Sequence, residues 1–193
     1  MIPRGLFLTG YRATGKTTIG RSLAQRLGVP MVDLDQVIQQ TAGQTIAGLF
    51  DAGGEVLFRD WESRCLADFV REHAESDQVL TRGKMPGSGP IGTVVSLGGG
   101  AILREQNRQL ISQNGTCIFL TATPETIWQR LSADDLSATQ RPALTELSPE
   151  QEIASVLAER MPLYEAAADF TIQTDDRSVA EIVDEIWKRL RET

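Results

Sequence analysis

Short runs of apolar and β-branched residues alternate along the chain with longer segments in which apolar residues recur every three or four positions. The short runs predict strands at Leu6–Thr9, Met31–Val32, Val94–Leu97, Cys117–Leu120 and Phe170–Ile172. The longer segments predict helices at Lys16–Leu27, Asp35–Gln40, Ile46–Phe50, Gly54–His73, Arg104–Ser112, Pro124–Leu131, Glu150–Ala167 and Val179–Arg191. Because buried strands alternate with helices, we expect a three-layer α/β fold in which helices cover a five-stranded parallel sheet.

Two segments interrupt this alternation. Residues 82–92 are too rich in glycine and proline for a helix or a central strand. We interpret them as a connector, which is either a surface excursion or a rim element in contact with a partner. Residues 132–146 are polar, carry Arg141 next to Pro142, and lie between two helices after the fourth strand. That position favours a lid.

Length, charge and composition exclude several classes of protein. A length of 193 residues suits a single domain over residues 1–193, and a net charge of −7 argues against a nucleic-acid-binding surface. No apolar run is long enough to cross a bilayer and no secretion signal is visible, so we expect a cytoplasmic monomer that binds neither nucleic acid nor membranes. Cys65 and Cys117 lie in apolar segments, where buried, reduced thiols are expected.

The clearest chemical motif is Gly10-Tyr11-Arg12-Ala13-Thr14-Gly15-Lys16-Thr17, which has the form G-x-x-x-x-G-K-[ST] between a predicted strand and a predicted helix. In this context the loop wraps the phosphates of a nucleotide with backbone N–H groups, aided by the positive end of the helix dipole. Lys16 supplies a charge for the β- and γ-phosphates, and Thr17 offers a hydroxyl to Mg²⁺. We therefore expect Mg²⁺ and a nucleoside triphosphate, with the phosphates held by Gly10, Arg12, Ala13, Thr14, Gly15, Lys16, Thr17 and Thr18.

Two aspartates and a glycine triplet follow later strands. Asp33 and Asp35 lie where the second predicted strand ends, at the edge of a parallel sheet where ligands bind. Asp33 is placed to hold Mg²⁺ through a water molecule. Asp35 is a candidate cap of the next helix and a candidate contact for a substrate hydroxyl, and neither role excludes the other. Gly98, Gly99 and Gly100 end the third strand, which favours a close approach of backbone to ligand over a plain loop.

Taken together, these motifs resemble shikimate kinase, a family of small P-loop kinases, over nearly the whole chain. The matching motifs are the GxxxxGKT loop with Thr18-Ile19-Gly20-Arg21, the D-x-D of Asp33-Leu34-Asp35, the G-E-x-x-F-R-x-x-E of Gly54–Glu62, the glycine triplet, Arg141-Pro142, and Arg160-Met161-Pro162-Leu163-Tyr164 followed by Ala168-Asp169. A phosphate loop alone would indicate only a nucleoside triphosphate. Six motifs in order are much more specific.

The resemblance implies a nucleoside-monophosphate-kinase-like fold with strand order 2-3-1-4-5, an acceptor-binding helical region at about residues 35–62 and a lid at about residues 132–146. It implies that ATP phosphorylates the 3-hydroxyl of shikimate, giving shikimate 3-phosphate and ADP in the chorismate pathway to aromatic amino acids. Arg59 and Arg160 would hold the acceptor carboxylate, since guanidinium groups match carboxylates bidentately. Glu62, one helical turn beyond Arg59, would orient it.

The resemblance also assigns the catalytic residues, namely Lys16, Asp35 and Arg141. Asp35 would bind acceptor hydroxyls, with the amides of Gly99 and Gly100 completing the pocket. Arg141 would fold over ATP from the lid and neutralise charge that develops on the transferred phosphoryl group. An ionised aspartate is a weak base toward an alcohol, so we assign Asp35 the orientation of the hydroxyl and keep proton acceptance as a hypothesis.

Two departures from the family pattern bear on the site. Ala13 stands where glycine is common, so we expect phosphate binding to require a negative φ at this residue. The third strand ends in Ser96 rather than in the metal-binding aspartate of many P-loop proteins, which shifts metal orientation to Asp33.

Two other functions stay open on the residues. One is another kinase for a carboxylated polyol, such as a gluconate kinase, because an arginine pair demands an anionic acceptor without identifying it. The other is a nucleotide-binding regulatory module without turnover. What weighs against this second alternative is the joint presence of Lys16, Asp33, Asp35, Arg59, Arg141 and Arg160.

Overall fold

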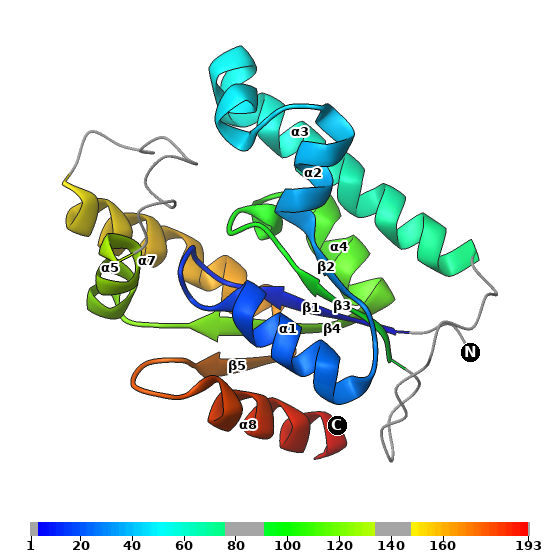
Figure 1. Cartoon of the computed structure of the whole chain (residues 1–193). Helices are drawn as coiled ribbons and strands as arrows, with labels where there is room; N and C mark the ends of the chain where they lie inside the picture. The colour runs from blue at the N-terminus through cyan, green and yellow to red at the C-terminus, as the bar shows by residue number, and fades with distance from the viewer. Residues whose placement is uncertain (1–3, 76–90, 134–147, 193) are drawn as a thin grey trace.

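The computed structural model describes residues 4–75, 91–133 and 148–192, which form a parallel sheet with helices on both faces (Figure 1). The strands are β1 (Arg4–Thr9), β2 (Met31–Asp33), β3 (Ile91–Ser96), β4 (Gly115–Thr121) and β5 (Phe170–Gln173). Their order is β2-β3-β1-β4-β5 and every neighbouring pair is parallel, which confirms the predicted fold class and strand order. The strand that leads into the phosphate loop, β1, is therefore central.

The helices are α1 (Lys16–Leu27), α2 (Leu34–Ala42), α3 (Ile46–Glu75), α4 (Glu105–Asn114), α5 (Pro124–Ser132), α7 (Pro149–Ala167) and α8 (Val179–Glu192), with the 3-10 turn η1 (Ala101–Leu103) before α4. Each predicted helix is present, with small shifts at its ends. The helices predicted over residues 46–50 and 54–73 are two halves of α3, separated by non-helical backbone at Gly53 and Gly54. Gly54 has φ 67° and ψ −164°, a conformation open essentially to glycine alone, so α3 bends there.

Successive side chains of a strand point to opposite faces of the sheet, so the molecule has one apolar core on each face. Leu6 and Leu8 of β1 pack on the face that α1 and α8 cover, whereas Phe7 packs on the opposite face with side chains of α2, α3 and α4. In the sheet Phe7 lies between Val95 of β3 and Cys117 of β4. Because both faces are covered, residues of either parity along a strand are buried, which explains why the strands are continuous apolar runs.

The two cysteines are buried and free, as expected. Burial raises the pKa of the Cys117 thiol to about 12 and, to a smaller extent, raises the pKa of the Cys65 thiol. Both thiols are therefore protonated at neutral pH and act as small apolar side chains in the core.

A third, smaller apolar cluster lies where α5 and α7 pack against each other. It contains Ile127 of α5, with Ile153, Val156 and Leu157 of α7, and the ring of Tyr11 from the phosphate loop is buried among them. This cluster joins the loop to α7.

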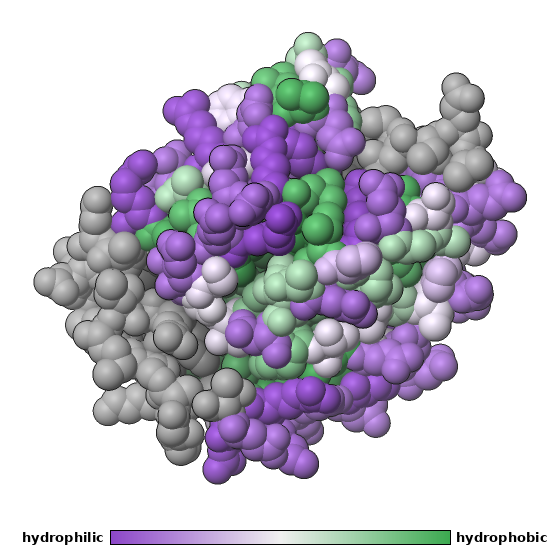
Figure 2. Space-filling view, turned by 180° about the vertical axis from the view of Figure 1, so that it is seen from behind, coloured by the Kyte–Doolittle hydropathy of each residue, from purple (hydrophilic) through white to green (hydrophobic). Residues whose placement is uncertain are grey.

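The outer surface of the described residues carries few large apolar side chains. Seen from behind, hydrophilic residues cover much of the molecule and smaller apolar areas lie between them (Figure 2). Val56 is the one large hydrophobic side chain that is exposed within the described ranges, at 71%. In those ranges, no helix combines the length and the apolar character needed to cross a membrane.

Two predicted segments fall largely outside the described residues. Residues 91 and 92 of the predicted connector belong to β3, and its other residues are not described. Of the predicted lid, residue 132 ends α5 and residue 133 caps it, whereas residues 134–146, with Arg141, lie outside the described ranges.

Candidate active site

Three groups of predicted ligand-binding residues lie at the carboxyl ends of β1, β2 and β3 (Figure 1). The loop from Gly10 follows β1, Asp33 ends β2, and the glycine triplet follows β3. A Cβ atom on Gly99 would lie 3.3 Å from the Gly10 carbonyl oxygen and 3.5 Å from the Arg12 backbone nitrogen. The glycine triplet therefore packs directly against the phosphate loop, and a side chain at Gly99 would press on it.

Two glycines give the phosphate loop its shape. Gly10 has φ 142°, and a Cβ atom there would collide with the carbonyl oxygen of Leu120 on β4. Gly15 has φ 91° and precedes the first residue of α1, so the helix begins at Lys16 as predicted. Because glycine has no side chain with which to cap the helix, the first N–H groups of α1 are left for an anion.

The backbone of Ala13 is left-handed, with φ 60°, so the expected negative φ is wrong. For an alanine this conformation costs about 1 kcal/mol. Arg130 of α5 holds the residue in place, since its Nη1 donates to the Ala13 carbonyl at 3.2 Å and to Thr174 Oγ1 at 3.0 Å, and its Nη2 donates to the Thr174 carbonyl at 2.7 Å. Sequence analysis missed Arg130, which belongs to no motif and meets the loop only in the folded chain.

Lys16 lies along the inside of the phosphate loop. Its Nζ donates to the carbonyl oxygens of Gly10 at 2.9 Å and Tyr11 at 2.7 Å. The hydroxyl of Thr14 donates to the same Tyr11 carbonyl at 2.8 Å. The ammonium group is thus held within the loop, where phosphate oxygens can take the place of these carbonyl groups.

Thr17, Asp33 and Ser96 form the candidate metal position. The Thr17 hydroxyl donates to Asp33 Oδ2 at 2.7 Å and lies 3.4 Å from Ser96 Oγ. A carboxylate and hydroxyl groups are hard oxygen ligands of the kind that Mg²⁺ prefers, and few are needed because Mg²⁺ keeps several waters. These residues therefore fit a magnesium ion shared with a triphosphate. Within the described ranges, no cluster of three or more Asp, Glu, His or Cys side chains offers a second cation position.

Asp33 also caps α2, a role that the sequence had left open for Asp35. The Asp33 carboxylate accepts a hydrogen bond from the Asp35 N–H at 3.1 Å, and the helix begins at Leu34. Asp35 therefore lies in the first turn and the capping alternative for it is wrong. Its side chain is directed to the glycine triplet, because a Cβ atom on Gly98 would lie 3.0 Å from Asp35 Oδ1.

Arg59 of α3 is buried, with 7% of its surface exposed, among carboxylates. Its Nη1 donates to Glu62 Oε2 at 2.6 Å, and its Nε donates to Glu55 Oε1 at 3.1 Å. Burial alone would lower the pKa of Arg59, but Glu62 and then Glu55 outweigh burial and raise the pKa above its usual value. The guanidinium group therefore stays charged, and the expected contact with Glu62 is confirmed.

Arg160 of α7 reaches the same place from a distant part of the chain. It is 9% exposed, and its Nη2 lies 3.9 Å from Glu55 Oε1. Arg59 Nη2 lies 3.1 Å from that same oxygen. The two guanidinium groups named from the sequence thus converge on one carboxylate oxygen and are both withdrawn from bulk solvent.

The glycine triplet is fixed between this arginine pair and the core. The hydroxyl of Tyr164 on α7 donates to the Gly99 carbonyl, and its ring stacks on Phe119 with 4.8 Å between ring centroids. Burial raises the pKa of Tyr164 to about 12, so the hydroxyl remains a donor at neutral pH. A Cβ atom on Gly100 would collide with the guanidinium group of Arg59. Glycine is therefore required where the backbone passes the arginine.

The remaining predicted residues are only partly drawn into the site. The Arg12 side chain turns to α7, where its Nη2 donates to Oε1 of the buried Glu152 at 3.0 Å, which leaves the Arg12 backbone N–H as its candidate phosphate donor. Thr18 is exposed on the first turn of α1. Arg141 lies outside the described residues, so its predicted place over the nucleotide is untested.

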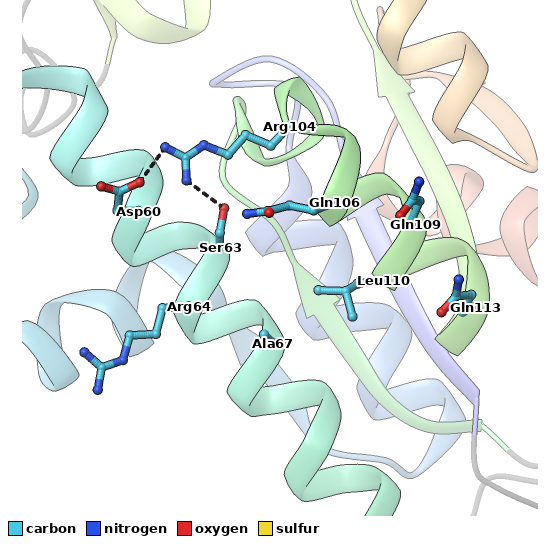
Figure 3. Close-up of a pocket in the computed structure, with 9 residues that line it drawn as sticks. All are labelled: Asp60, Ser63, Arg64, Ala67, Arg104, Gln106, Gln109, Leu110 and Gln113. Atoms are coloured by element: carbon cyan, nitrogen blue, oxygen red, sulfur yellow. Dashed lines mark hydrogen bonds and ion pairs between the residues drawn. The ribbon is translucent and has the colours of Figure 1, made fainter.

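A groove of about 580 Å³ lies between α3 and α4, apart from these residues (Figure 3). Arg104 spans it, since its Nη2 donates to Asp60 Oδ1 at 2.6 Å and its Nη1 donates to Ser63 Oγ at 3.3 Å. The lining residues are Asp60, Ser63, Arg64, Ala67, Arg104, Gln106, Gln109, Leu110 and Gln113. No predicted site residue lines the groove. Its bridging arginine instead braces α3, which carries Arg59, against the segment that follows the glycine triplet.

Comparison with known proteins gives consistent matches over the chain. A family model described as shikimate kinase matches residues 12–88 and 85–191. The chain is 42% identical over 186 residues to a shikimate kinase of Rhodopirellula baltica, which covers 96% of this chain and 90% of that protein. It is similar to the structure of a shikimate kinase from Acinetobacter baumannii in complex with shikimate, with a TM-score of 0.82, 30% identity, and coverage of 98% and 94% of the two chains.

A gluconokinase from Sinorhizobium meliloti bears on the alternative acceptor. It matches with a TM-score of 0.53 and 16% identity, over 99% of this chain and 95% of that chain. A likeness at this identity shows the shared fold alone.

Proposed function

The chain belongs to the shikimate kinase family, whose activity is the ATP-dependent phosphorylation of shikimate, and we propose that the residues at the ends of β1, β2 and β3 carry out this transfer. The products are shikimate 3-phosphate and ADP, in the pathway through chorismate to aromatic amino acids. One observation supports the choice of an acid acceptor above all others. Arg59 and Arg160 converge on a single carboxylate oxygen beside a phosphate loop.

The acceptor carboxylate binds to Arg59 and Arg160. Guanidinium groups match a carboxylate with paired, charge-assisted hydrogen bonds, which lysine cannot reproduce. Glu62 keeps Arg59 in position from the buried side. The acceptor ring then lies against the glycine triplet, where Gly99 and Gly100 present backbone rather than side chains and Asp35 reaches a hydroxyl group.

The triphosphate binds along the phosphate loop. Backbone N–H groups of residues 12–17 and the start of α1 hold the β- and γ-phosphates, and Lys16 exchanges its contacts with loop carbonyls for contacts with phosphate oxygens. Since the glycine triplet lies against Gly10 and Arg12, the acceptor and the γ-phosphate are neighbours. Alignment of the two and neutralisation of charge supply most of the rate, because phosphoryl transfer needs little covalent help.

Thr17 through its hydroxyl and Asp33 through a water would hold Mg²⁺, with Ser96 beside them. When bound, this ion neutralises phosphate charge and orients the β- and γ-phosphates. Arg141 keeps its expected role in charge neutralisation as a prediction from the family resemblance.

In the transfer itself, the acceptor hydroxyl oxygen forms a bond to the γ-phosphorus while the bond from that phosphorus to the β–γ bridging oxygen breaks. ADP leaves with the electron pair of that bond. Asp35 orients the hydroxyl group, and proton acceptance by its carboxylate is a hypothesis within this proposal. We expect Asp35→Asn to lower kcat by about 10²–10⁴-fold, measured by ADP release. An enzyme that keeps most of its kcat would remove Asp35 from the mechanism.

The direct test is ADP formation that depends on added shikimate, followed in a coupled assay. A panel with gluconate and other carboxylated polyols distinguishes the acceptors, and Lys16→Ala controls for a contaminating kinase. Turnover with gluconate but not with shikimate would favour the other polyol kinase. Tight ATP binding with no acceptor-dependent ADP release would favour a regulatory module.

We also propose that the active unit is a monomer in the cytoplasm. Light scattering after size-exclusion chromatography tests the monomer. Two free, buried cysteines and a need for ATP suit a reducing compartment that contains nucleotides.

A further inference from the structure

Glu55 places a carboxylate of the chain itself in the arginine pair. Its Oε1 lies 3.1 Å from both Nε and Nη2 of Arg59 and 3.9 Å from Nη2 of Arg160. A single oxygen thus contacts two guanidinium groups, which is the arrangement that the carboxylate of a small acid would adopt there.

The two glutamates that contact Arg59 differ in their surroundings. Glu62 is fully buried, at 0% exposed, and binds Nη1, the amino group that Glu55 does not contact. Glu55 has 42% of its side chain exposed and binds the other edge of the guanidinium group. Moving Glu62 away would leave a buried charge, whereas moving Glu55 away exposes its carboxylate to water at little cost.

The backbone next to Glu55 also suits a side chain that can leave. Glu55 follows the bend of α3 at Gly53 and Gly54, where the helical hydrogen-bond ladder is interrupted. It is the first residue after Gly54, and 42% of its side chain is exposed. The Glu55 side chain therefore already borders the solvent into which it would rotate.

We propose that Glu55 is an internal stand-in for the acceptor carboxylate, which neutralises Arg59 and Arg160 in the free enzyme and is displaced when the acid acceptor binds. This inference rests on the proposed function. Glu55 acts as a specificity-determining residue, because a ligand must break its contacts before it can bind. For an acceptor, contacts to Asp35 and the glycine triplet offset the free energy needed to displace Glu55. A small inorganic anion makes no such contacts.

The proposal predicts an effect of unusual sign. Loss of a residue that binds the acceptor weakens binding, but Glu55→Gln should strengthen it, because the arginine pair loses its competitor. Two partly exposed ion pairs correspond to about 3- to 10-fold in affinity. We expect the Kd for shikimate, measured by calorimetry, to fall by this factor in Glu55→Gln. The affinity for sulfate should rise at least as much, since sulfate gains nothing from the other contacts.

Matched variants separate this role from a structural one. Glu72→Gln removes an exposed carboxylate from the same helix and should leave both affinities unchanged. Glu55→Ala, checked by thermal unfolding, repeats the test with a side chain that cannot donate or accept a hydrogen bond. A Kd for shikimate that is unchanged or higher in both Glu55 variants overturns the proposal.

The failure of this inference can be distinguished from the failure of the proposed function. If the wild-type enzyme phosphorylates shikimate but Glu55→Gln binds it no more tightly, the function stands and the inference fails. If the wild-type enzyme does not use shikimate, sulfate binding still reports whether Glu55 competes for the arginine pair. Equal sulfate affinity in wild type and Glu55→Gln overturns the inference in that case as well.

Discussion

The two halves of the site are built in different ways. The nucleotide half is one continuous stretch, Gly10–Thr17, whose candidate ligands are mainly backbone N–H groups between a strand and a helix. The acceptor half combines Arg59 of α3, Arg160 of α7 and the glycine triplet after β3, and its ligands are buried charged side chains. Substitutions in the two halves should therefore differ in kind. Changes to the acceptor half should cost stability as well as activity, whereas changes to the nucleotide half should cost activity with little loss of stability.

The largest expected effect is on the stability of the acceptor half. Arg59→Met leaves Glu62 fully buried without its contact to the guanidinium group. Removing one partner of a buried ion pair costs about 3–5 kcal/mol, so we expect the free energy of unfolding in urea to fall by that amount. The double variant Arg59→Met/Glu62→Leu should recover most of it, because the buried carboxylate that lost its partner is removed as well.

Arg104→Met is the matched control, since it breaks a more exposed ion pair to Asp60 on the helix that carries Arg59, with 30% and 60% of the Arg104 and Asp60 side chains exposed. It should cost less than about 1 kcal/mol. An equal loss in Arg59→Met and Arg104→Met would contradict the claim that the acceptor half is part of the core.

In the nucleotide half, substitutions should lower activity strongly and stability little. Lys16→Ala removes the charge that faces the β- and γ-phosphates, and we expect kcat to fall by about 10²–10³-fold. Its free energy of unfolding should change by about 1 kcal/mol or less, because the hydrogen bonds from Nζ to the loop carbonyls are only partly buried. ADP release and urea unfolding measure the two effects, with Lys188→Ala on α8 as the control. A loss of stability as large as that of Arg59→Met would remove the distinction between the halves.

Alkaline pH tests the anchor of the glycine triplet. The pKa of Tyr164 is raised by burial to about 12 from its ordinary value near 10. Between these values the unfolded chain loses the phenol proton first, so the folded state loses stability as pH rises, by about 2 kcal/mol at pH 12.

Tyr164→Phe removes both the hydrogen bond to Gly99 and this titration. At pH 7 it should be less stable than wild type by about 1 kcal/mol, and above pH 10 its stability should fall less steeply. Urea unfolding at pH 7 to 12 measures both. Parallel curves for the two proteins across that range would show that Tyr164 does not titrate as described.

The smallest expected effect concerns the shape of the phosphate loop. Ala13→Gly relieves the left-handed backbone at φ 60° and should raise the free energy of unfolding by about 1 kcal/mol. Gly28→Ala is the converse control, because Gly28 has φ 66° and a Cβ atom there would meet nothing within 4 Å, so only the backbone conformation is penalised. If both substitutions shift stability in the same direction, the loop is not strained at Ala13.

Much of this molecule follows from patterns that are local in sequence. The apolar runs predicted the strands, and the motif Gly10–Thr17 predicted a helix that begins at Lys16, because a glycine-bounded turn and a helix start depend on residues a few positions apart. The break in α3 also follows from Gly53 and Gly54 alone. The pairing of Arg59 with Arg160 was inferred only through the family resemblance, since no spacing rule relates residues that far apart.

The sequence by itself therefore determined the parallel α/β architecture and the phosphate loop, whereas the arginine pair was named through the family resemblance. The tertiary structure decided that Asp33 rather than Asp35 caps α2, that Ala13 is left-handed beneath Arg130, and that Glu55 lies between the two arginines. The physical reason is the range of the interactions. Strand, turn and helix-start preferences act between neighbours in the chain, whereas the positions of buried charges depend on which distant side chains the packed sheet and helices bring within hydrogen-bonding distance.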